Sequence, residues 1–244
     1  MIEVQALARH FGGVEAVSDL SFIARDGSIT GLLGSNGAGK TTTLRMICGV
    51  LRPQGGAVRV DGISPYPDRR SVQRKVGALL DHMGLYPRLT ARENLTYFGQ
   101  LHGIAPERLK QRVDELISLL GLQPVAGRRT AGFSQGERMK TALGRSMIHS
   151  PNNLLLDEPT NGLDVPTVRS LRLFLQRVRD AGACVVFSSH VLEEVRALCD
   201  NVVIISKGRL IAEGSPGELC RQTSCASLED AFVKLTGVAE IPAC

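Results

Sequence analysis

A glycine-rich segment at residues 34–41 constrains this 244-residue chain more than any other feature. The segment reads Gly-Ser-Asn-Gly-Ala-Gly-Lys-Thr, matches the pattern G-x-x-x-x-G-K-[ST], and stands between a short apolar run and a helical pattern. Its glycines let backbone amides turn toward a phosphate, and the helix start adds unpaired N–H groups and a positive dipole end. The predicted nucleotide-binding residues are Gly34, Ser35, Asn36, Gly37, Ala38, Gly39, Lys40, Thr41 and Thr42.

Two side chains at the end of this loop have separate predicted tasks. Lys40 would bridge the β- and γ-phosphates of ATP, and Thr41 would bind Mg²⁺ through its hydroxyl, with the metal joining two phosphate groups. The alternative is a glycine-rich turn with an incidental lysine, which the full match to the pattern disfavours. ATP and Mg²⁺ are therefore the predicted substrate and cofactor.

A second candidate element is the apolar run 154–156, which ends in two carboxylates. Ligands of open α/β sheets lie beyond the carboxyl ends of the strands. Asp157 is therefore predicted to reach the Mg²⁺ shell, and Glu158 to face the attacking water as the general base. An acidic pair on the surface is the alternative, which the apolar run before it and Pro159 after it disfavour.

The remaining pattern predicts an α/β fold. Short apolar runs at 154–156, 185–187 and 202–205 suit buried strands of a mostly parallel sheet with helices on both faces. An Asp-Gly pair within 57–64 predicts a hairpin. Residues 85–150 contain helical patterns and no strand candidate, so they are predicted to form an inserted helical subdomain. One of its helices has an apolar stripe that we expect to face a core: Leu109, Val113, Leu116, Ile117 and Leu120.

Two further motifs follow the phosphate loop in order: residues 157–164, Asp-Glu-Pro-Thr-Asn-Gly-Leu-Asp, and residues 187–190, Phe-Ser-Ser-His. With them the chain resembles the ATP-binding subunits of ABC transporters over nearly its whole length. The resemblance implies a P-loop NTPase core of the RecA type, with a mixed, mainly parallel sheet, an N-terminal antiparallel β region and the inserted helical subdomain. It implies an ABC ATPase domain at 1–220, with its core at 1–84 and 151–220 and its helical subdomain at 85–150, and a C-terminal tail at 221–244.

The resemblance also implies roles for single residues. Phe11 is similar to the aromatic residue that stacks on adenine in the family, although a lone phenylalanine is more often part of a core. His190 is similar to the histidine that contacts the γ-phosphate, which makes it a predicted catalytic residue beside Lys40 and Glu158. Asp164 ends the first motif and is assigned to coupling between parts of the transporter.

Two positions depart from the family pattern. Residues 133–137, Phe-Ser-Gln-Gly-Glu, occupy the place of the signature Leu-Ser-Gly-Gly-Gln, and there they also fit an S-x-x-E capping box for a helix reaching to about residue 148. Asp81 stands where the family usually has a glutamine; we expect it at the metal site and in coupling. The residues of the signature, which by resemblance meets the ATP of a second subunit, are Ser134, Gln135, Gly136 and Glu137.

The resemblance implies partners. The chain is expected to dimerise, with itself or with a paralogous ATPase subunit, against a separate membrane permease. No apolar run approaches the ~20 residues of a membrane-spanning helix, so we expect a cytoplasmic protein held on the inner face of the cell membrane through the permease. The net charge of +5 comes from Lys and Arg spread along the chain, and no nucleic-acid partner is expected.

Residues 84–95 and 227–232 resemble the exporter branch that includes sodium-efflux and drug-resistance ATPases, so the predicted function is ATP hydrolysis coupled to export. Two other functions share the motifs. A soluble ABC ATPase acting on ribosomes or nucleic acid usually has tandem ATPase halves or a long coiled-coil insertion, and this chain shows neither. A regulatory nucleotide-binding module without turnover would lack the base, whereas Glu158 is present.

Overall fold

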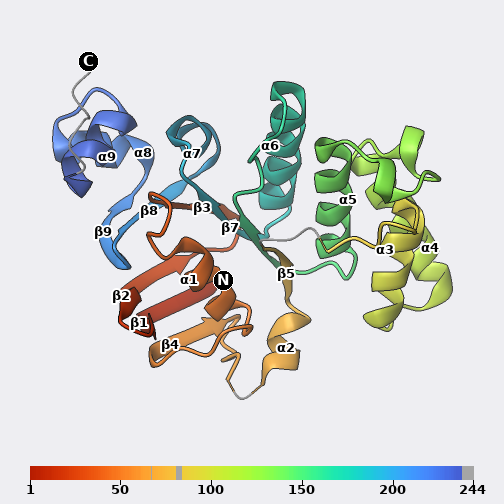
Figure 1. The fold of residues 1–244 in the computed structure, drawn as a ribbon, viewed down its shortest axis with the longest axis horizontal. Helices are drawn as coiled ribbons and strands as arrows, with labels where there is room; N and C mark the ends of the chain where they lie inside the picture. The colour runs from red at the N-terminus through yellow and green to blue at the C-terminus, as the bar shows by residue number, and fades with distance from the viewer. Residues whose placement is uncertain (67, 81–83, 238–244) are drawn as a thin grey trace.

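The computed structural model describes residues 1–66, 68–80 and 84–237. Within these ranges a central sheet of six strands has the order β5-β6-β7-β3-β8-β9 (Figure 1). All of its neighbouring pairs are parallel except β8 and β9, so the prediction of a mixed, mainly parallel sheet is confirmed. The strands are β3 (Ser28–Leu33), β5 (Val76–Leu79), β6 (Asn153–Asp157), β7 (Cys184–Ser189), β8 (Asn201–Ser206) and β9 (Arg209–Gly214).

The two faces of this sheet bury different sets of side chains, because successive residues of a strand point to opposite faces. In β6, Leu154 and Leu156 belong to one hydrophobic cluster and Leu155 to the other. The same alternation holds in β8, where Val202 and Val203 belong to opposite clusters. Both faces are therefore covered, which explains why these strands are apolar without a break.

A second, antiparallel sheet follows the order β2-β1-β4 and consists of β1 (Ile2–Phe11), β2 (Val14–Ala24) and β4 (Gly55–Val60). The expected N-terminal antiparallel region is confirmed. The Asp-Gly turn predicted within 57–64 is confirmed: Asp61 and Gly62 have positive φ, and the residues on either side of them, Val60 and Ile63, exchange two backbone hydrogen bonds. The antiparallel pairing stops at this bridge, and β4 pairs with β1 instead. The turn signal was present, but no apolar strand follows it to pair with β4.

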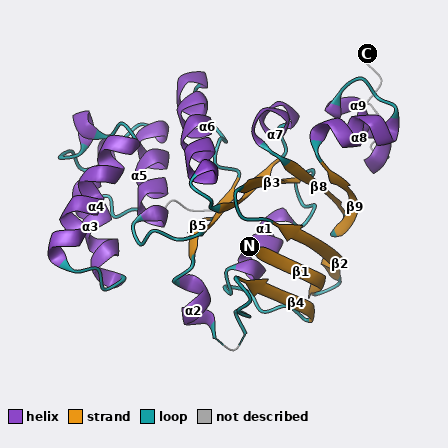
Figure 2. Ribbon diagram, turned by 180° about the vertical axis from the view of Figure 1, so that it is seen from behind, coloured by secondary structure: helices purple, strands orange, loops and turns teal. Residues whose placement is uncertain are grey.

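Helix α1 (Lys40–Ile47) packs between the two sheets, where it contacts β1, β2, β4 and β6. The short α2 (Arg69–Gln73) leads into β5. On the other face of the central sheet, α6 (Val165–Asp180) and α7 (Leu192–Leu198) cover β3 and β7. Figure 2 shows α1 beside β1 and β4, away from α6 and α7.

The last two elements of the described residues are α8 (Pro216–Thr223) and α9 (Leu228–Thr236), which pack on each other and on β9 (Figure 1). Leu228 and Ala231 of α9 are fully or almost fully buried. The predicted boundary between the ATPase domain and the C-terminal tail, at residue 220, falls within α8.

Residues 85–150 contain α3 (Ala91–Leu101), α4 (Pro106–Leu119), α5 (Gln135–Met147) and two 3₁₀ turns, Gln123–Val125 and Thr130–Gly132. No strand occurs in this range, all of which the structure describes, so the expected helical character is confirmed. The apolar stripe predicted around α4 is buried at all five positions. Across the described residues, no helix is both long and apolar enough to cross a membrane.

His149 connects the helical subdomain to the central sheet. Its Nε2 lies 3.2 Å from the carbonyl oxygen of Val76 on β5, and its ring stacks on that of His102 with the centroids 3.9 Å apart. A carbonyl only accepts, so Nε2 carries the hydrogen. Burial, with smaller contributions from the charges of His102 and Arg112, lowers the pKa of His149 to about 4.

This pKa makes the free energy of unfolding depend on pH. Between about 4 and the ordinary value of 6.5 the unfolded chain binds a proton at residue 149 that the folded chain excludes, so acidification favours unfolding. We expect His149→Gln to flatten the pH dependence of the unfolding free energy in this window, as measured by urea titration. His10→Gln, at an exposed site, is the control. An unchanged slope in His149→Gln would show that the buried imidazole does not contribute.

Candidate active site

The carboxyl ends of three neighbouring strands bring the predicted site residues together. β6, β7 and β3 lie side by side and run parallel, so the segments that follow them emerge at one edge of the sheet. The phosphate loop follows β3, Asp157 ends β6 with Glu158 directly after it, and His190 follows β7. This is the edge where ligands of open α/β sheets bind.

The phosphate loop requires glycine at two positions where space or backbone geometry excludes a side chain. At Gly34, a Cβ atom would lie 2.4 Å from the carbonyl oxygen of Ile205. At Gly39, φ is +104° and a Cβ would lie 2.4 Å from the carbonyl oxygen of Ala16. Gly39 also caps α1 without a side-chain hydrogen bond, and the first turn of α1 has no acidic residue. The N–H groups at this helix start therefore lack a side-chain partner, which is the condition for binding a phosphate.

Lys40 lies over this loop. Its Nζ donates to the carbonyl oxygens of Gly34, at 2.7 Å, and Ser35, at 3.2 Å, and it forms an ion pair with Glu158 at 3.1 Å. The side chain is only 5% exposed. A buried ammonium group needs such partners, because leaving water is costly for a charge.

Thr41 and Asp157 form the candidate metal site. The Thr41 hydroxyl donates to Asp157 Oδ2 at 2.6 Å, and the Ser188 hydroxyl donates to Asp157 Oδ1 at 2.5 Å. A hydroxyl and a carboxylate are the hard oxygen donors that Mg²⁺ prefers, and Mg²⁺ takes its remaining ligands from water and substrate phosphates. The two residues therefore fit Mg²⁺. Asp81, predicted for the same site, lies outside the described residues.

Glu158 is held from three directions. Its backbone N–H lies 3.0 Å from the Ser188 hydroxyl, one carboxylate oxygen pairs with Lys40, and the other is 2.5 Å from His190 Nδ1. Because a carboxylate accepts, His190 Nδ1 carries the hydrogen. Glu158 also has φ of +46°, a left-handed conformation that is unfavourable for a residue with a side chain. Such a backbone persists only where the surroundings fix it, and it directs the carboxylate to the edge of the sheet.

Ser188 is a residue of this site to which sequence reasoning gave no role. It is fully buried in β7, yet its hydroxyl contacts both Asp157 and the backbone of Glu158. A second such residue is Glu194 on α7, whose carboxylate accepts from the hydroxyls of Thr160 and Ser189. The sequence contained one signal for Ser188, a pair of serines at the end of an otherwise apolar strand.

The predicted capping box at the start of α5 is confirmed. Ser134 accepts from the backbone of Glu137 at 3.2 Å, and the Glu137 carboxylate accepts from the backbone of Ser134 at 2.8 Å. Ser134 and Gln135 are exposed, and Gly136 and Glu137 are half-buried. Within the chain this segment does not contact Lys40 or Glu158 through any hydrogen bond or ion pair of the described residues.

Gln135 makes a contact that the sequence did not predict. Its side-chain amide donates to the carbonyl oxygen of Asn161 at 2.8 Å, in the loop that follows Glu158. The amide also fills the space beside Gly162, where a Cβ would lie 2.5 Å from Nε2. The residue that replaces a family glycine thus links the head of α5 to the loop 160–164 of the same chain.

Two other predicted residues lie at the ends of regular elements. Phe11 ends β1, is 45% exposed, and has the Arg9 guanidinium 4.9 Å from its ring centroid. Asp164 is the N-cap of α6 and accepts from the backbone of Thr167 at 3.1 Å. Hydrogen bonding to the Thr167 side chain, and secondly to this backbone N–H, lowers the pKa of Asp164. The cap gives Asp164 a structural task in addition to the predicted coupling.

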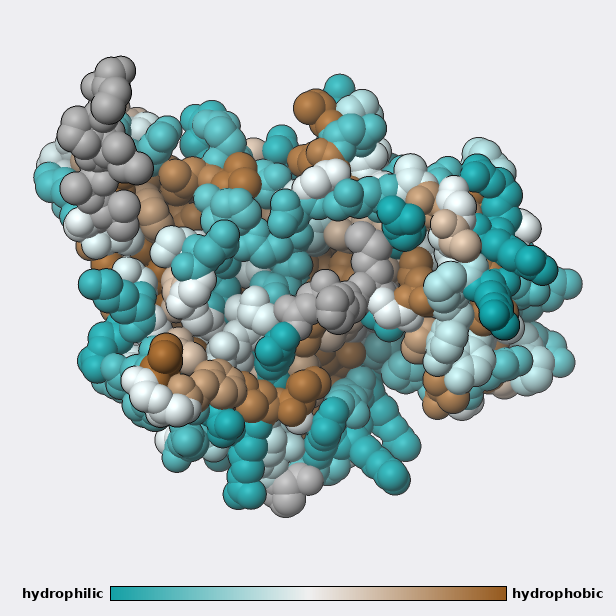
Figure 3. All heavy atoms as spheres, viewed as in Figure 1, coloured by the Kyte–Doolittle hydropathy of each residue, from teal (hydrophilic) through white to brown (hydrophobic). Residues whose placement is uncertain are grey.

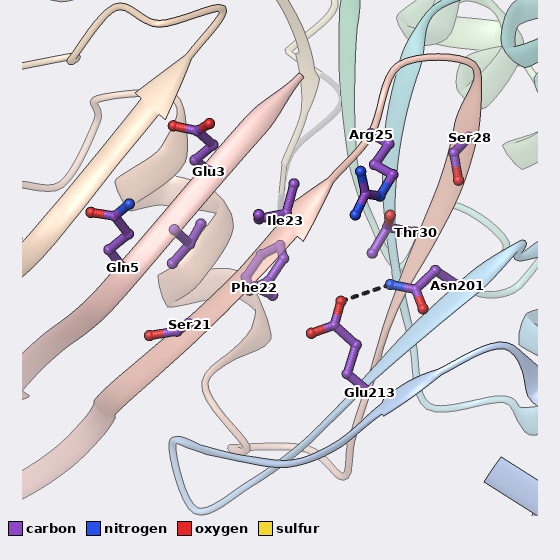
Figure 4. A pocket seen from close by; sticks show the side chains of 11 residues that line it. Glu3, Gln5, Ser21, Phe22, Ile23, Arg25, Ser28, Thr30, Asn201 and Glu213 are labelled. Carbon is purple, nitrogen blue, oxygen red and sulfur yellow. Dashed lines mark hydrogen bonds between the residues drawn. The ribbon is translucent and has the colours of Figure 1, made fainter. Parts of the chain in front are cut away.

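A cavity of about 630 Å³ lies elsewhere, between β1 and β2 on one side and β3, β8 and β9 on the other (Figure 4). Its walls include Arg25, Thr30 and the hydrogen-bonded pair Asn201 and Glu213, whose atoms are 2.9 Å apart. Of the predicted nucleotide and metal residues that the structure describes, none lines it. The candidate site is therefore an open edge of the sheet and not this cavity.

Comparison with known proteins identifies the family to which this geometry corresponds. The family model described as "ABC transporter" matches residues 17–161. The ABC transporter ATP-binding protein NatA of Bacillus subtilis is 43% identical over 203 residues, which cover 83% of this chain and 82% of NatA.

Solved structures agree. A structure titled as the ATP binding subunit of an ABC transporter superposes with a TM-score of 0.88 at 27% identity, covering 96% of this chain and 99% of the other. The dimeric post-hydrolysis state of the cassette MJ0796 bound to ADP and Pi superposes with a TM-score of 0.79 at 22% identity, over 88% and 98% of the two chains, and shows that the fold is shared.

Removing the Gln135 amide should loosen the loop 160–164. We expect Gln135→Ala to accelerate amide hydrogen exchange in this loop while costing about 1 kcal/mol or less in stability, because the hydrogen bond is exposed. Mass spectrometry of exchanged peptides measures the effect. Gln123→Ala removes a similar exposed amide bond, to Ser118, and is the control. Equal exchange in both variants would show that Gln135 does not hold the loop.

Proposed function

The chain belongs to the ABC transporter family as an ATP-binding and hydrolysing subunit, and from that premise we propose that the residues at the carboxyl edge of β3, β6 and β7 hydrolyse ATP to drive export through a separate membrane permease. The observation that carries the proposal is a connected set of side chains at this edge. Asp157 is hydrogen-bonded to Thr41, and Glu158 forms an ion pair with Lys40 and a hydrogen bond with His190.

Phosphate binding would fall to the loop amides and Lys40. The loop supplies N–H groups without side-chain caps, and the phosphates of ATP would compete with Glu158 for the ammonium group of Lys40. Phosphate oxygens carry more charge than one carboxylate, so ATP binding would weaken the ion pair between Lys40 and Glu158. Phe11 would contact the adenine.

Hydrolysis would then use the Glu158 carboxylate, which is released when the phosphates of ATP take its place beside Lys40. Glu158 would accept a proton from water as the water attacks the γ-phosphate in line. Its left-handed backbone and the hydrogen bond that its backbone N–H donates to the Ser188 hydroxyl fix the position of the carboxylate before substrate arrives. His190, already 2.5 Å from Glu158, would orient it and contact the γ-phosphate.

The metal would be Mg²⁺, held by Thr41 and Asp157. When bound, it supplies positive charge to the phosphate oxygens. The Ser188 hydroxyl keeps one Asp157 oxygen in place, so the other remains directed toward Thr41. A contribution from Asp81 to this site stays a prediction.

The signature residues would act on the ATP of a second subunit, a copy of this chain or a paralogue. In a two-fold dimer the same surface is used by both subunits, so each chain would supply Lys40 and Glu158 to one ATP and Ser134 and Gly136 to the other. The exposed, capped start of α5 suits this task, because a helix start binds anions. The dimeric MJ0796 cassette, which shares this fold, provides support.

ATP would favour the closed dimer and hydrolysis would favour opening, which is the differential affinity that can move a permease. The helical subdomain would transmit the movement. The chain would then work at the inner face of the cell membrane, and the selectivity for the exported compound would belong to the permease.

Glu158→Gln should separate binding from hydrolysis. The variant keeps a side chain of the same size that cannot accept the proton, so we expect ATP binding to persist and turnover to fall by about 10²-fold or more. Phosphate release and nucleotide titration measure the two properties. Glu229→Gln, at an exposed site on α9, is the matched control. Turnover equal to the wild type would exclude Glu158 as the base.

The shared site predicts nucleotide-dependent assembly. In sedimentation, the Glu158→Gln chain should dimerise with ATP and dissociate with ADP. Adding Ser134→Arg should prevent the dimer by steric bulk without preventing ATP binding, whereas Ser118→Arg, exposed on α4, should not. A monomer at saturating ATP, or a dimer that tolerates Ser134→Arg, would refute the shared site.

A further inference from the structure

A second cavity, of about 660 Å³, lies where the helical subdomain meets β5. Residues 102–105 between α3 and α4, one side of α4, and residues 148–150 after α5 form most of its wall, and Arg74, which follows α2, contributes from the core. None of the described residues proposed for ATP or Mg²⁺ lines it. Its volume is within the range of sites that hold a small organic ligand.

The wall of this cavity is strongly basic. Arg74, Arg108 and Arg112 line it, and Glu115 is the one acidic residue among the described residues of the wall. Glu115 pairs with Arg112 at 3.3 Å and, like Arg74 and Arg108, is exposed. Arg74 and Arg108 form no side-chain hydrogen bond or ion pair with the described residues. Asp68 interacts only weakly with Arg74: hydrogen bonds from Ser71 are the main cause of its lowered pKa, and the charge of Arg74 is a smaller cause.

Two histidines in the wall add no positive charge at neutral pH. Burial lowers the pKa of His102, and burial with neighbouring charges lowers that of His149. His149 Nε2 donates to Val76, which leaves Nδ1 as an acceptor, and Nδ1 is buried without a partner among the described residues. In Arg112 the Nε donor is likewise buried without a partner among the described residues. Its two other nitrogens donate to the Glu115 carboxylate and to the carbonyl oxygen of Met147.

We propose that this cavity is a binding site for the phosphate group of a phosphate monoester. Arginine forks bind phosphate oxygens in pairs of charge-assisted hydrogen bonds, and three guanidinium groups suit a dianion with three oxygens better than a carboxylate with two. The volume exceeds that of a bare phosphate, so an organic group fits beside it.

The site would connect the ATPase core to the helical subdomain. Arg74 belongs to the core, whereas Arg108 and Arg112 belong to α4 of the helical subdomain. Figure 3 shows hydrophilic side chains over α2 and, across a recess, over α3 and α4. An anion bound to both groups would hold the parts together at the junction already joined by His149.

The first experiment uses the full chain and the ring signals of His102 and His149 in NMR spectra, which report on this cavity and not on the phosphate loop. Inorganic phosphate and glycerol 3-phosphate are titrated at constant ionic strength against chloride. We expect saturable shifts of both rings. Arg74→Gln and Arg108→Gln should each weaken binding by about tenfold, the typical worth of a charge-assisted hydrogen bond, and Arg169→Gln on α6 should not change it.

A second readout is the pKa of His149, which bound phosphate should raise because a nearby anion favours the imidazolium. The charged groups among the described residues that line the cavity with it are Arg74, Arg108, Arg112 and Glu115, and His102 is stacked on the ring. Vesicles of phosphatidic acid in phosphatidylcholine test whether a lipid supplies the phosphate, and an arginine-dependent response to either source supports the site. No saturable response to any probe, or one that both arginine variants leave unchanged, would overturn it.

Discussion

The structure depends on a central sheet whose inner strands are buried on both faces and carry most of their polar residues at their ends. In β7 every residue from Cys184 to Ser189 is buried, and the first exposed side chain is His190. Burial forces the polar groups to the edge, and the parallel order of β6, β7 and β3 makes it the same edge for all three. The site is thus a consequence of how the core packs.

The sequence was sufficient for the fold class and for the residues that gather at this edge. Phosphate-loop spacing and uninterrupted apolar runs are local signals, and they specified β3, β6, β7 and β8. β5 has only four residues, of which Gly77 carries no side chain, and so gave too short a pattern to predict. The partner of β4 also escaped prediction, because strand pairing over about fifty residues depends on tertiary packing.

Interactions between distant segments were the other part that the sequence did not reveal. The contacts of Ser188 with Asp157 and Glu158 join β7 to β6, and that of Gln135 joins α5 to the loop after β6. Each is made by a common polar residue with no distinctive spacing. A motif identifies which residues do the chemistry, but the residues that hold them are found only once the strands are placed side by side.

Helix α5 has anchors at both of its ends. Its thirteen residues run from the capped start at Ser134, with the Gln135 contact to Asn161, to the joint formed by His149 and Val76. At 1.5 Å per residue this is a rod of about 20 Å. Without the Gln135 contact the rod would be pinned only at the His149 joint, and a small rotation there would displace Ser134 by several ångströms.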